Sequence, residues 1–388
     1  MRERRVDAKQ AVKKAIDDAG ERLVDLSHRI HANPELGFAE HKASRWVAEE
    51  LERGGLDVQL GVADLPTALV ATAGSGPLVL GICCEYDALP DVGHACGHNV
   101  IAAAGVGAAI GLAGLADELG ITVKVFGTPA EEGGGGKVLM LERGVFADTH
   151  ACMMVHPSRY ERVDTKMLAI SSYRVDYTGK EAHASAHPAE GINAADALTV
   201  AQVSVGLLRQ HIQATDRIHG IVTHGGEAPN IVPAHTSASY YVRAADFEAL
   251  ETLTAKVRAC FDAGAMATGA AIQVSEPTPP YAEMLNDEVM MAYYKANAEA
   301  AGRQFPELSP RELAAVGSSD MGNVSRAMPS IHPMLGLDCG DSGNHQPEFA
   351  RHCAGPSADA AVVQGATAMA WTYADLAGDE LQRTRLMT

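Results

Sequence analysis

The amino-acid sequence predicts an α/β fold in which a mostly parallel sheet is combined with a smaller, inserted α+β domain. Helix-like stretches separate the first three of four short apolar runs, as expected for strands of a parallel sheet that is covered on both faces. A chain of 388 residues, 47% of them hydrophobic, is long enough for two domains. The four predicted strands are Leu78–Cys84, Ile121–Gly127, Thr149–Val155 and Ile331–Leu337.

Helical patterns accompany these strands. Apolar residues recur every three to four positions over residues 7–32 and 40–54, and Asn33-Pro34 separates the two predicted helices. The longest uncharged stretch, residues 99–116, contains four glycines and is followed by Asp117. It is short for a membrane span, so we expect a buried helix there.

The middle of the chain has a different pattern and predicts the inserted domain. Pro277, Pro279 and Pro280 follow its last strand and form a plausible hinge. We assign residues 1–170 and 281–388 to the larger α/β domain and residues 171–280 to the insertion. The insertion's expected elements are strands over 169–178, 218–224, 234–244 and 271–276 and helices over 193–213 and 247–263.

Composition restricts the partners and the compartment. The chain has 49 acidic and 31 basic residues, a formal net charge of −18, which disfavours nucleic acid and anionic membranes as partners. The first twenty residues contain no apolar core of a secretory signal, so we expect a cytoplasmic protein. Its seven cysteines, an odd number, are then expected to be reduced thiols.

Polar clusters follow the predicted strands at their carboxyl ends, where open α/β sheets bind ligands. We therefore expect these clusters to converge on one crevice. They are Glu85-Tyr86-Asp87 with His94, Cys96 and His98 after the first strand, Glu131-Glu132 after the second, His156 after the third and His345 after the fourth.

The residue types in these clusters suit a metal site. Thiolate, imidazole and carboxylate are ligands of Zn²⁺ and similar divalent ions. Cys96-Gly97-His98 places two donors two residues apart, with a glycine that allows a tight bend. Of the adjacent Glu131 and Glu132, one can bind metal while the other takes a proton from a water whose pKa the metal lowers toward ~7.

A single histidine or carboxylate carries little weight, because the chain has 16 histidines. We interpret six histidines as ordinary surface or core residues. Asp87 has two interpretations: it caps a turn before Pro90, or it holds a ligand histidine through the second ring nitrogen. The six histidines are His94, His187, His211, His219, His235 and His352.

Taken together, the ordered motifs resemble the co-catalytic metallohydrolase family of glutamate carboxypeptidase G, bacterial aminoacylases and dipeptidases, and plant indole-acetyl-amino-acid hydrolases. The resemblance spans nearly the whole chain. It is carried by HANPELGF (31–38), EYDALP (85–90), GHACGHN (93–99), GTPAEEGGGGK (127–137), VHP (155–157), GKEAHASAHPAEGINA (179–194), GGEAPNIVPA (225–234), GSSDMGNVS (317–325) and NHQPEF (344–349).

The resemblance implies hydrolysis of an amide or peptide bond in a small N-acyl amino acid or dipeptide, with two divalent ions as cofactors. Zn²⁺ or Mn²⁺ is expected, with Co²⁺ and Ni²⁺ as further candidates. Cys96 matches the ligand that bridges both ions, Glu132 and His345 complete one site, and His98 and His156 complete the other. Glu131 matches the general base and Asp87 a carboxylate near the ligands.

The family's inserted domain is a lid that also forms a homodimer, so the resemblance implies both for residues 171–280. His183 matches a lid histidine that reaches across the dimer to stabilise the oxyanion. Asn230 and Arg243 match lid residues that recognise a substrate carboxylate, a task that suits the planar guanidinium. A structural ion pair is the other interpretation of Arg243.

Two departures from the family pattern narrow the subgroup. Glu85-Tyr86-Asp87 stands where many relatives have Asp-Met-Asp, and Ser318-Ser319-Asp320-Met321 where many have Ser-Glu-Asp-Phe. Both resemble the branch of aminobenzoyl-glutamate hydrolase subunits and of dipeptidases that remove basic residues. Alternatives to an N-acyl-amino-acid hydrolase are a dipeptidase for one dipeptide class and a catalytically silent binding or partner subunit.

Overall fold

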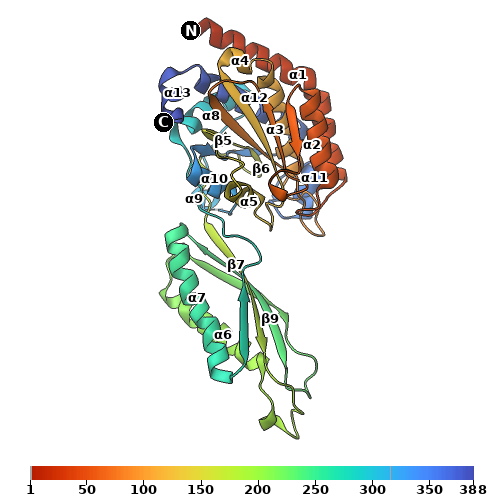
Figure 1. Cartoon of the computed structure of the whole chain (residues 1–388), viewed down its shortest axis with the longest axis vertical. Helices are drawn as coiled ribbons and strands as arrows, with labels where there is room; N and C mark the ends of the chain where they lie inside the picture. Colours follow the sequence, from red (N-terminus) through yellow and green to blue (C-terminus); the bar gives the residue numbers. More distant parts are fainter. Residues whose placement is uncertain (1, 315) are drawn as a thin grey trace. The chain divides into compact units, whose positions relative to one another are not determined.

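The computed structural model describes residues 2–314 and 316–388 and divides the chain into two compact units (Figure 1). The first unit contains the residues up to Lys166 together with Met284–Thr388, and the second contains Met167–Glu283. Each unit has its own sheet and its own hydrophobic core.

The first unit is built on a six-stranded sheet in the order β1-β2-β4-β3-β5-β11. The four strands from β4 to β11 are parallel, whereas β1 and β2 add an antiparallel edge. The predicted mostly parallel sheet is therefore confirmed. The strands are β1 (Asp57–Leu60), β2 (Leu69–Ala73), β3 (Leu78–Glu85), β4 (Ile121–Thr128), β5 (Ala151–Met153) and β11 (Ser330–Ile331).

Helices pack against one another and against this sheet. One face of α1 (Arg2–Ala32) is a stripe of fully buried residues, among them Ile16, Leu23 and Ile30, as its three-to-four spacing predicts. The stretch predicted as a buried helix is α3 (His98–Ala113), which lies directly on β3. The other helices of this unit are α2 (His41–Arg53), α4 (Ala116–Leu119), α5 (Gly136–Glu142), α8 (Glu288–Ala300), α9 (Pro310–Leu313), α10 (Met321–Ala327), α11 (Pro347–His352), α12 (Pro356–Ala377) and α13 (Glu380–Met387).

The fourth predicted strand is divided in two. Ser330–Ile331 pairs with β5, whereas β12 (Met334–Gly336) pairs with β6 (His156–Ser158) in a separate two-stranded ladder. His332-Pro333 lies between them, and a proline has no N–H to donate to a ladder. The third predicted strand also ends early, at Met153 instead of Val155.

The second unit is a four-stranded antiparallel sheet, ordered β10-β7-β9-β8, with two helices on one face. Alternate side chains of β9, such as Ala238, Tyr240 and Val242, join the helices in a core, so the residues between them face the opposite side. The elements are β7 (Ala169–Thr178), α6 (Ala194–Leu208), β8 (Arg217–His224), β9 (His235–Ala244), α7 (Phe247–Thr268) and β10 (Ala271–Ser275).

These elements follow the predicted order of strands and helices. The predicted helix over 193–213 is shorter, because α6 ends at Leu208 and a 3-10 turn, Arg209–His211, follows. Asn193 and Asp246 cap α6 and α7 by accepting backbone N–H bonds at the helix starts.

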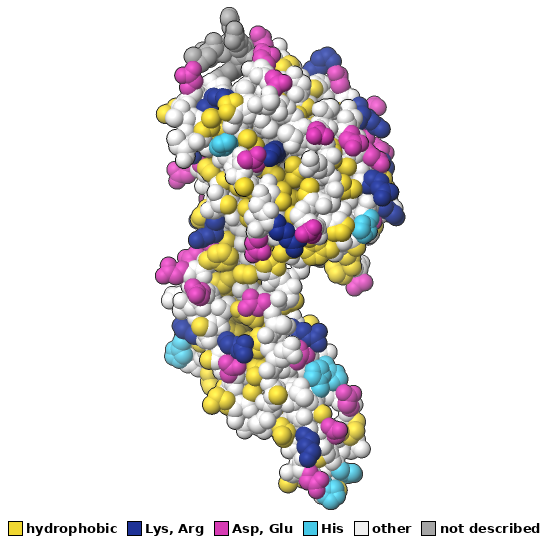
Figure 2. All heavy atoms as spheres, viewed as in Figure 1, with side chains coloured by type: hydrophobic (Ala, Val, Ile, Leu, Met, Phe, Trp, Pro, Cys, Tyr) yellow, Lys and Arg dark blue, Asp and Glu magenta, His cyan; other side chains and the backbone are white. Residues whose placement is uncertain are grey.

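The surface agrees with the acidic composition. On the face shown in Figure 2, Asp and Glu side chains are interspersed with Lys and Arg, without a continuous basic stripe among the described residues. None of the described helices is long and apolar enough to cross a membrane.

Candidate metal centre

The predicted donors follow the strands, on loops or, for His98 and His156, at the first residue of α3 and of β6. β3 ends at Glu85, and the chain then leads through Cys96 to His98, the first residue of α3. The turn after β4 carries Glu131 and Glu132. The His345 N–H donates to Ala95 O (2.9 Å), which ties the loop before α11 to the Cys96 loop.

Gly97 gives the Cys96 loop its bend. Its φ of +76° is in the left-handed region, and a Cβ there would lie 2.8 Å from Pro157 Cγ and 3.1 Å from Cys353 Sγ. Only glycine combines an unstrained positive φ with the absence of a Cβ that would collide with these neighbours. The bend brings Cys96 and His98, two residues apart, into one cluster.

Two groups of donor atoms share Cys96, and a third consists of Glu85, His98 and Glu131. The first group is Cys96, His98 and His156, and the second is Cys96, Glu132 and His345, each with donor atoms within 4.8 Å of one another. His98 Nε2 lies 3.8 Å from Glu132 Oε1, which lies 3.6 Å from His345 Nε2. The fold therefore brings together the five donors expected from the sequence.

These residues fit divalent cations. Within the described part of the chain, the buried His98 Nε2 and Glu132 Oε1 have no hydrogen-bond partner, and leaving such atoms unpaired is costly. Burial, and then the Glu132 carboxylate, raise the pKa of the Cys96 thiol well above its usual range. A bound cation would pair the two orphaned atoms and stabilise the thiolate.

The two buried histidines among the predicted donors, His98 and His156, each have one ring nitrogen fixed by another group. His98 Nδ1 bonds Asp87 Oδ1 (2.9 Å), and His156 Nδ1 bonds Pro157 O (2.8 Å). When these Nδ1 atoms carry the proton, each Nε2 presents a lone pair. Asp87 Oδ2 also accepts the Glu132 N–H (3.0 Å), so one carboxylate links two donors.

Glu131 is held beside the donors by a strained turn. Ala130 before it has a φ of +56°, uncommon for a residue with a Cβ. Glu131 Oε2 lies 3.9 Å from His98 Nε2. Burial, followed by the carboxylates of Glu85, Glu132 and Asp320, raises the pKa of Glu131 well above its usual range. A carboxylate in such surroundings has a high affinity for a proton, as a general base needs.

Comparisons with known proteins agree with this geometry. Residues 84–370 match the model of peptidase family M20/M25/M40. The chain belongs to this family. It is 36% identical over 383 residues to the Xaa-Arg dipeptidase of Mus musculus, covering 95% of this chain and 88% of the relative. It is 30% identical over 330 residues to a p-aminobenzoyl-glutamate hydrolase subunit of Escherichia coli, covering 79% of this chain and 68% of the relative.

Solved structures of the family share the fold. The YXEP protein of Bacillus subtilis, described as a dinuclear metal-binding peptidase from the M20 family, has a TM-score of 0.68 at 21% identity, over 93% of this chain and 99% of that one. These relatives confirm the family and branch predicted from the motifs. As a member of the M20/M25/M40 family, the chain is a metal-dependent hydrolase of amide or peptide bonds in small molecules.

Several contacts of buried polar residues around the M20 site were not anticipated from the sequence. The fully buried Lys137 ammonium lies 2.5 Å from Glu85 Oε1 and 2.7 Å from Asp320 Oδ1. Glu85 Oε2 faces His98 Nε2 at 3.4 Å, and the His332 ring lies near that of His156, tilted by 33° with ring centroids 5.4 Å apart. Glu85 belongs to the polar cluster expected after the first strand, whereas the only hint for Lys137 was its position at the end of GTPAEEGGGGK.

Glu40 is a further unanticipated residue, and it supports the turn that carries Glu131. Glu40 Oε1 accepts the Ala130 N–H (2.8 Å), and Oε2 accepts the Thr67 hydroxyl (2.8 Å). It lies just before α2 and is fully buried. Nothing in its sequence context distinguishes it from an exposed glutamate.

The three predicted lid residues of this family member lie in the second unit. His183 and Asn230 are on adjoining segments, since His183 bridges Ile231 and the Ala184 N–H donates to Asn230 O (3.0 Å). His183 Nδ1 faces the N–H groups of Ser185 and Ala186 (3.4 and 3.3 Å), so its Nε2 carries the proton in the neutral ring. Arg243 lies near the carboxyl end of β9 (His235–Ala244), beside Tyr241.

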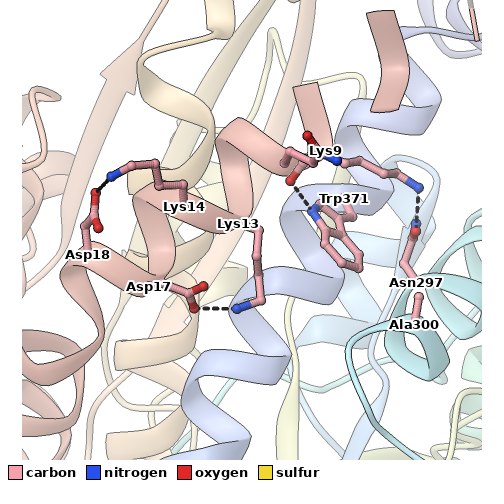
Figure 3. A pocket seen from close by; sticks show the side chains of 9 residues that line it. Lys9, Lys13, Lys14, Asp17, Asp18, Asn297, Ala300 and Trp371 are labelled. Atoms are coloured by element: carbon pink, nitrogen blue, oxygen red, sulfur yellow. Dashed lines mark hydrogen bonds and ion pairs between the residues drawn. The ribbon is translucent and has the colours of Figure 1, made fainter. Parts of the chain in front are cut away.

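A surface hollow of about 690 Å³ lies outside the M20 site (Figure 3). It is lined by α1, α8 and α12, and Trp371 lies about 22 Å along α12 from the end that approaches the metal centre. Several of its polar groups are paired within the fold: Lys9 Nζ contacts Asn297 (2.7 Å) and Asp375 (2.6 Å), and the Trp371 indole donates to Lys9 O (2.8 Å).

Proposed function

We propose that the two donor groups hold two divalent cations, with Cys96 as the shared ligand. The supporting observation is that Cys96, His98 and His156 form one group, and Cys96, Glu132 and His345 the other. When bound, the cations would polarise the amide carbonyl and lower the pKa of a water molecule toward ~7.

Glu131 is the proposed general base and acid. It would take the proton from the attacking water and return it to the nitrogen of the departing amine. Its neighbour Glu132 has a different task, as a cation ligand. The strained Ala130 and the N–H bond to Glu40 keep the two glutamates directed to their separate positions.

The variant Glu131→Gln tests this division of tasks. Because the amide cannot accept the proton, we expect turnover to fall by at least ~10²-fold. Metal content, measured by elemental analysis, should stay at the wild-type value, since Glu131 is not a ligand in this scheme. Glu132→Gln provides the contrast and should lose metal. Wild-type turnover in Glu131→Gln would refute the role.

The proposed substrate is a dipeptide or N-acyl amino acid whose carboxyl-terminal residue is basic. Support comes from the identity to an Xaa-Arg dipeptidase, which is higher and covers more of the chain than that to the p-aminobenzoyl-glutamate hydrolase. The net charge of −18 also favours the approach of cationic molecules. An N-acyl-glutamate is the alternative suggested by the second relative.

A matched panel would decide between these substrates. It contains alanyl- and benzoyl-conjugates of arginine, lysine, leucine and glutamate, and release of the free amino acid is followed by chromatography. We expect kcat/KM to be highest for the basic residues. A preference for glutamate would support the alternative. Two bound metals without hydrolysis of any member would indicate a catalytically silent protein.

The second unit would act as the lid. His183, whose Nε2 carries the proton, would donate to the oxyanion, and Asn230 and Arg243 would bind the substrate carboxylate. These groups lie far apart within one lid. Arg243 is eight residues along β9 from His235, roughly 26 Å, and His183 and Asn230 lie on the chain segments beyond His235.

This separation supports a homodimer, because a single lid is too long to present both groups to one small substrate. The lid also has surfaces suited to a second copy. β8 is an edge strand of its sheet, and the apolar side chains of Val203, Leu207 and Ile221 are 57–67% exposed. A partner's lid would then supply His183 and Asn230 to the site that uses Arg243.

The proposed cations are Zn²⁺ or Mn²⁺, with Co²⁺ and Ni²⁺ as further candidates, since a thiolate donor favours the softer ions. Reloading metal-free protein with each ion separately, and measuring affinity and turnover, would identify the working metal. All seven cysteines are free thiols. This fits the reducing cytoplasm proposed as the compartment.

A further inference from the structure

A small hollow lies beside the metal centre, in the first unit alone. Its volume is about 180 Å³, and Glu132 and Asp87 are among the residues that line it. Leu36 and Phe38, from the segment before α2, form an apolar wall of the same hollow. The hollow is therefore lined both by a proposed cation ligand and by an apolar wall.

Leu36 and Phe38 are large apolar residues that line the hollow and are open to solvent. They are 49% and 38% exposed. Phe38 also has a φ of +63°, a conformation that costs a residue with a side chain roughly 1–2 kcal/mol. Strain of this kind is retained where a side chain's position matters for function.

The segment that carries Phe38 is fixed to the turn that carries Glu131 and Glu132. A Cβ on Gly134 would lie 2.4 Å from Phe38 Cε2, so the ring lies directly against the glycine. A Cβ on Gly37 would lie 2.7 Å from Ala130 Cβ. The apolar wall and the catalytic turn thus contact each other without intervening side chains.

Hydrogen bonds make this wall rigid from the other side. Glu35 Oε2 accepts the N–H groups of Lys42 and Ala43 (2.8 and 3.0 Å), and the Ala88 N–H donates to Glu35 O (2.8 Å). The hollow is therefore formed before any ligand arrives, which reduces the entropy lost on binding.

The polar groups at the hollow already have partners or a proposed ligand role. Asp87 is bonded to His98 and to the Glu132 N–H, and Glu132 is a proposed cation ligand. An incoming group would meet mainly Leu36, Phe38, Pro90 and Ala130. A cavity of about 150 Å³ holds a benzene ring, so this one suits a group up to roughly phenyl size.

We propose that this hollow is the subsite for the group on the acyl side of the scissile bond, and that it selects small apolar groups up to a phenyl ring. The assignment rests on the proposed function, in which the lid binds the carboxylate of the other half of the substrate. Phe38 and Leu36 are then the residues that determine acyl specificity. Acetyl, butanoyl and benzoyl groups are small enough for the hollow, whereas an indole-acetyl group is too large.

The test uses the metal-loaded full chain and four N-acyl-arginines that carry acetyl, butanoyl, benzoyl or indole-3-acetyl groups. In wild type we expect kcat/KM to rise from acetyl to benzoyl and to fall at least ~10-fold for indole-acetyl, the usual scale for a misfit in an apolar pocket. In Phe38→Ala the benzoyl-to-acetyl ratio should fall about 10-fold and the indole-acetyl-to-benzoyl ratio should rise. Leu36→Ala should change the same ratios less.

Ratios within one variant separate specificity from general damage, because a loosened fold would lower kcat/KM equally for all four substrates. Leu60→Ala is the matched control, since Leu60 is 46% exposed in the same unit but does not line the hollow. Unchanged ratios in both Phe38→Ala and Leu36→Ala would overturn the subsite while the hydrolase remains. If wild type cleaves none of the four, nor any member of the wider panel, the proposed function fails first.

Discussion

Glu40 shows how a single buried carboxylate can support the turn that carries Glu131, the proposed general base. It accepts one hydrogen bond from Ala130, next to Glu131, and one from Thr67. Burial, and then the nearby Asp87 carboxylate, raise the pKa of Glu40 to about 7. The folded protein therefore binds a proton at Glu40 that the unfolded chain has already lost above pH 4.5.

This raised pKa predicts a pH-dependent stability. The contribution of the protonated Glu40 to the free energy of unfolding is fully present below pH 4.5. It is lost as pH rises through about 7, a change of roughly 3 kcal/mol. The glutamine in Glu40→Gln does not titrate. The free energy of unfolding of this variant, relative to that of wild type, should therefore increase between pH 5 and pH 8. Urea unfolding at both pH values, at equal metal content, would measure the difference.

The exposed Glu49 on α2 supplies the control for this measurement. The free energy of unfolding of Glu49→Gln should differ from that of wild type by the same amount at both pH values. A constant difference for Glu40→Gln as well would contradict the raised pKa.

At this scale, sequence reasoning identified the residues with distinctive chemistry and missed those with ordinary chemistry in unusual places. The five donors stand in recognisable motifs at strand ends, so their types and positions were informative. Lys137, Glu85 and Asp320 were not foreseen as a buried group, because their pairing joins positions 52 and 183 residues apart. A charged residue's burial depends on partners that only the folded chain brings close.

At the scale of elements, the apolar runs predicted the central strands well. β3 and β4 each extend one residue beyond the prediction, whereas the fourth run became two short strands around His332-Pro333. β1 and β2 were missed because they are short and partly exposed, at the antiparallel edge of the sheet. Apolar periodicity identifies buried strands, but it is a weak signal for partly exposed strands at the edge of a sheet.

The start of α3 gives a prediction about the connection between Cys96 and His98. In Gly97→Ala the new Cβ meets Pro157, and the residue keeps a φ of +76°, so the loop must shift. Because a ligand set tolerates displacements of only a few tenths of an ångström, we expect metal affinity to fall at least ~10-fold. Competition with a chelating dye would measure the affinity, and circular dichroism would confirm the fold.

Two other glycines separate the causes of this effect. Gly55 also has a positive φ (+87°) but has open space at its Cβ position, so Gly55→Ala reports backbone strain alone. Gly114, at the opposite end of α3, has a φ of −69° and open space, so Gly114→Ala should leave affinity and stability nearly unchanged. Wild-type metal affinity in Gly97→Ala would show that the loop's bend does not position the donors.

At the scale of the whole molecule, the order of elements predicted an α/β unit interrupted by an α+β unit. The family comparison adds the chemistry of the first unit. Sequence patterns could not predict how His183, Asn230 and Arg243 relate to one another in space. The length of β9 now supplies this relation, since Arg243 lies near one end of the strand and the other two lie beyond its opposite end.

The proposed exchange of residues between two copies predicts recovery of activity on mixing. His183→Ala and Arg243→Ala should each be nearly inactive alone. When the two are unfolded together and refolded, or expressed together, half of the dimers are mixed, and each mixed dimer has one complete site. Activity should then return to about a quarter of wild type, as random pairing of two chains requires.

The same assembly predicts that the exposed apolar side chains of the lid hold the dimer together. Leu207→Lys and Ile221→Lys place charges where a second copy would cover them, and we expect monomers by sedimentation velocity and loss of turnover with metal content retained. Leu381→Lys, on α13 of the first unit and 74% exposed, should change neither property. Full turnover by a monomer, or no recovery in the mixing experiment, would contradict a shared site, because either result requires one chain to supply every group that acts on the substrate.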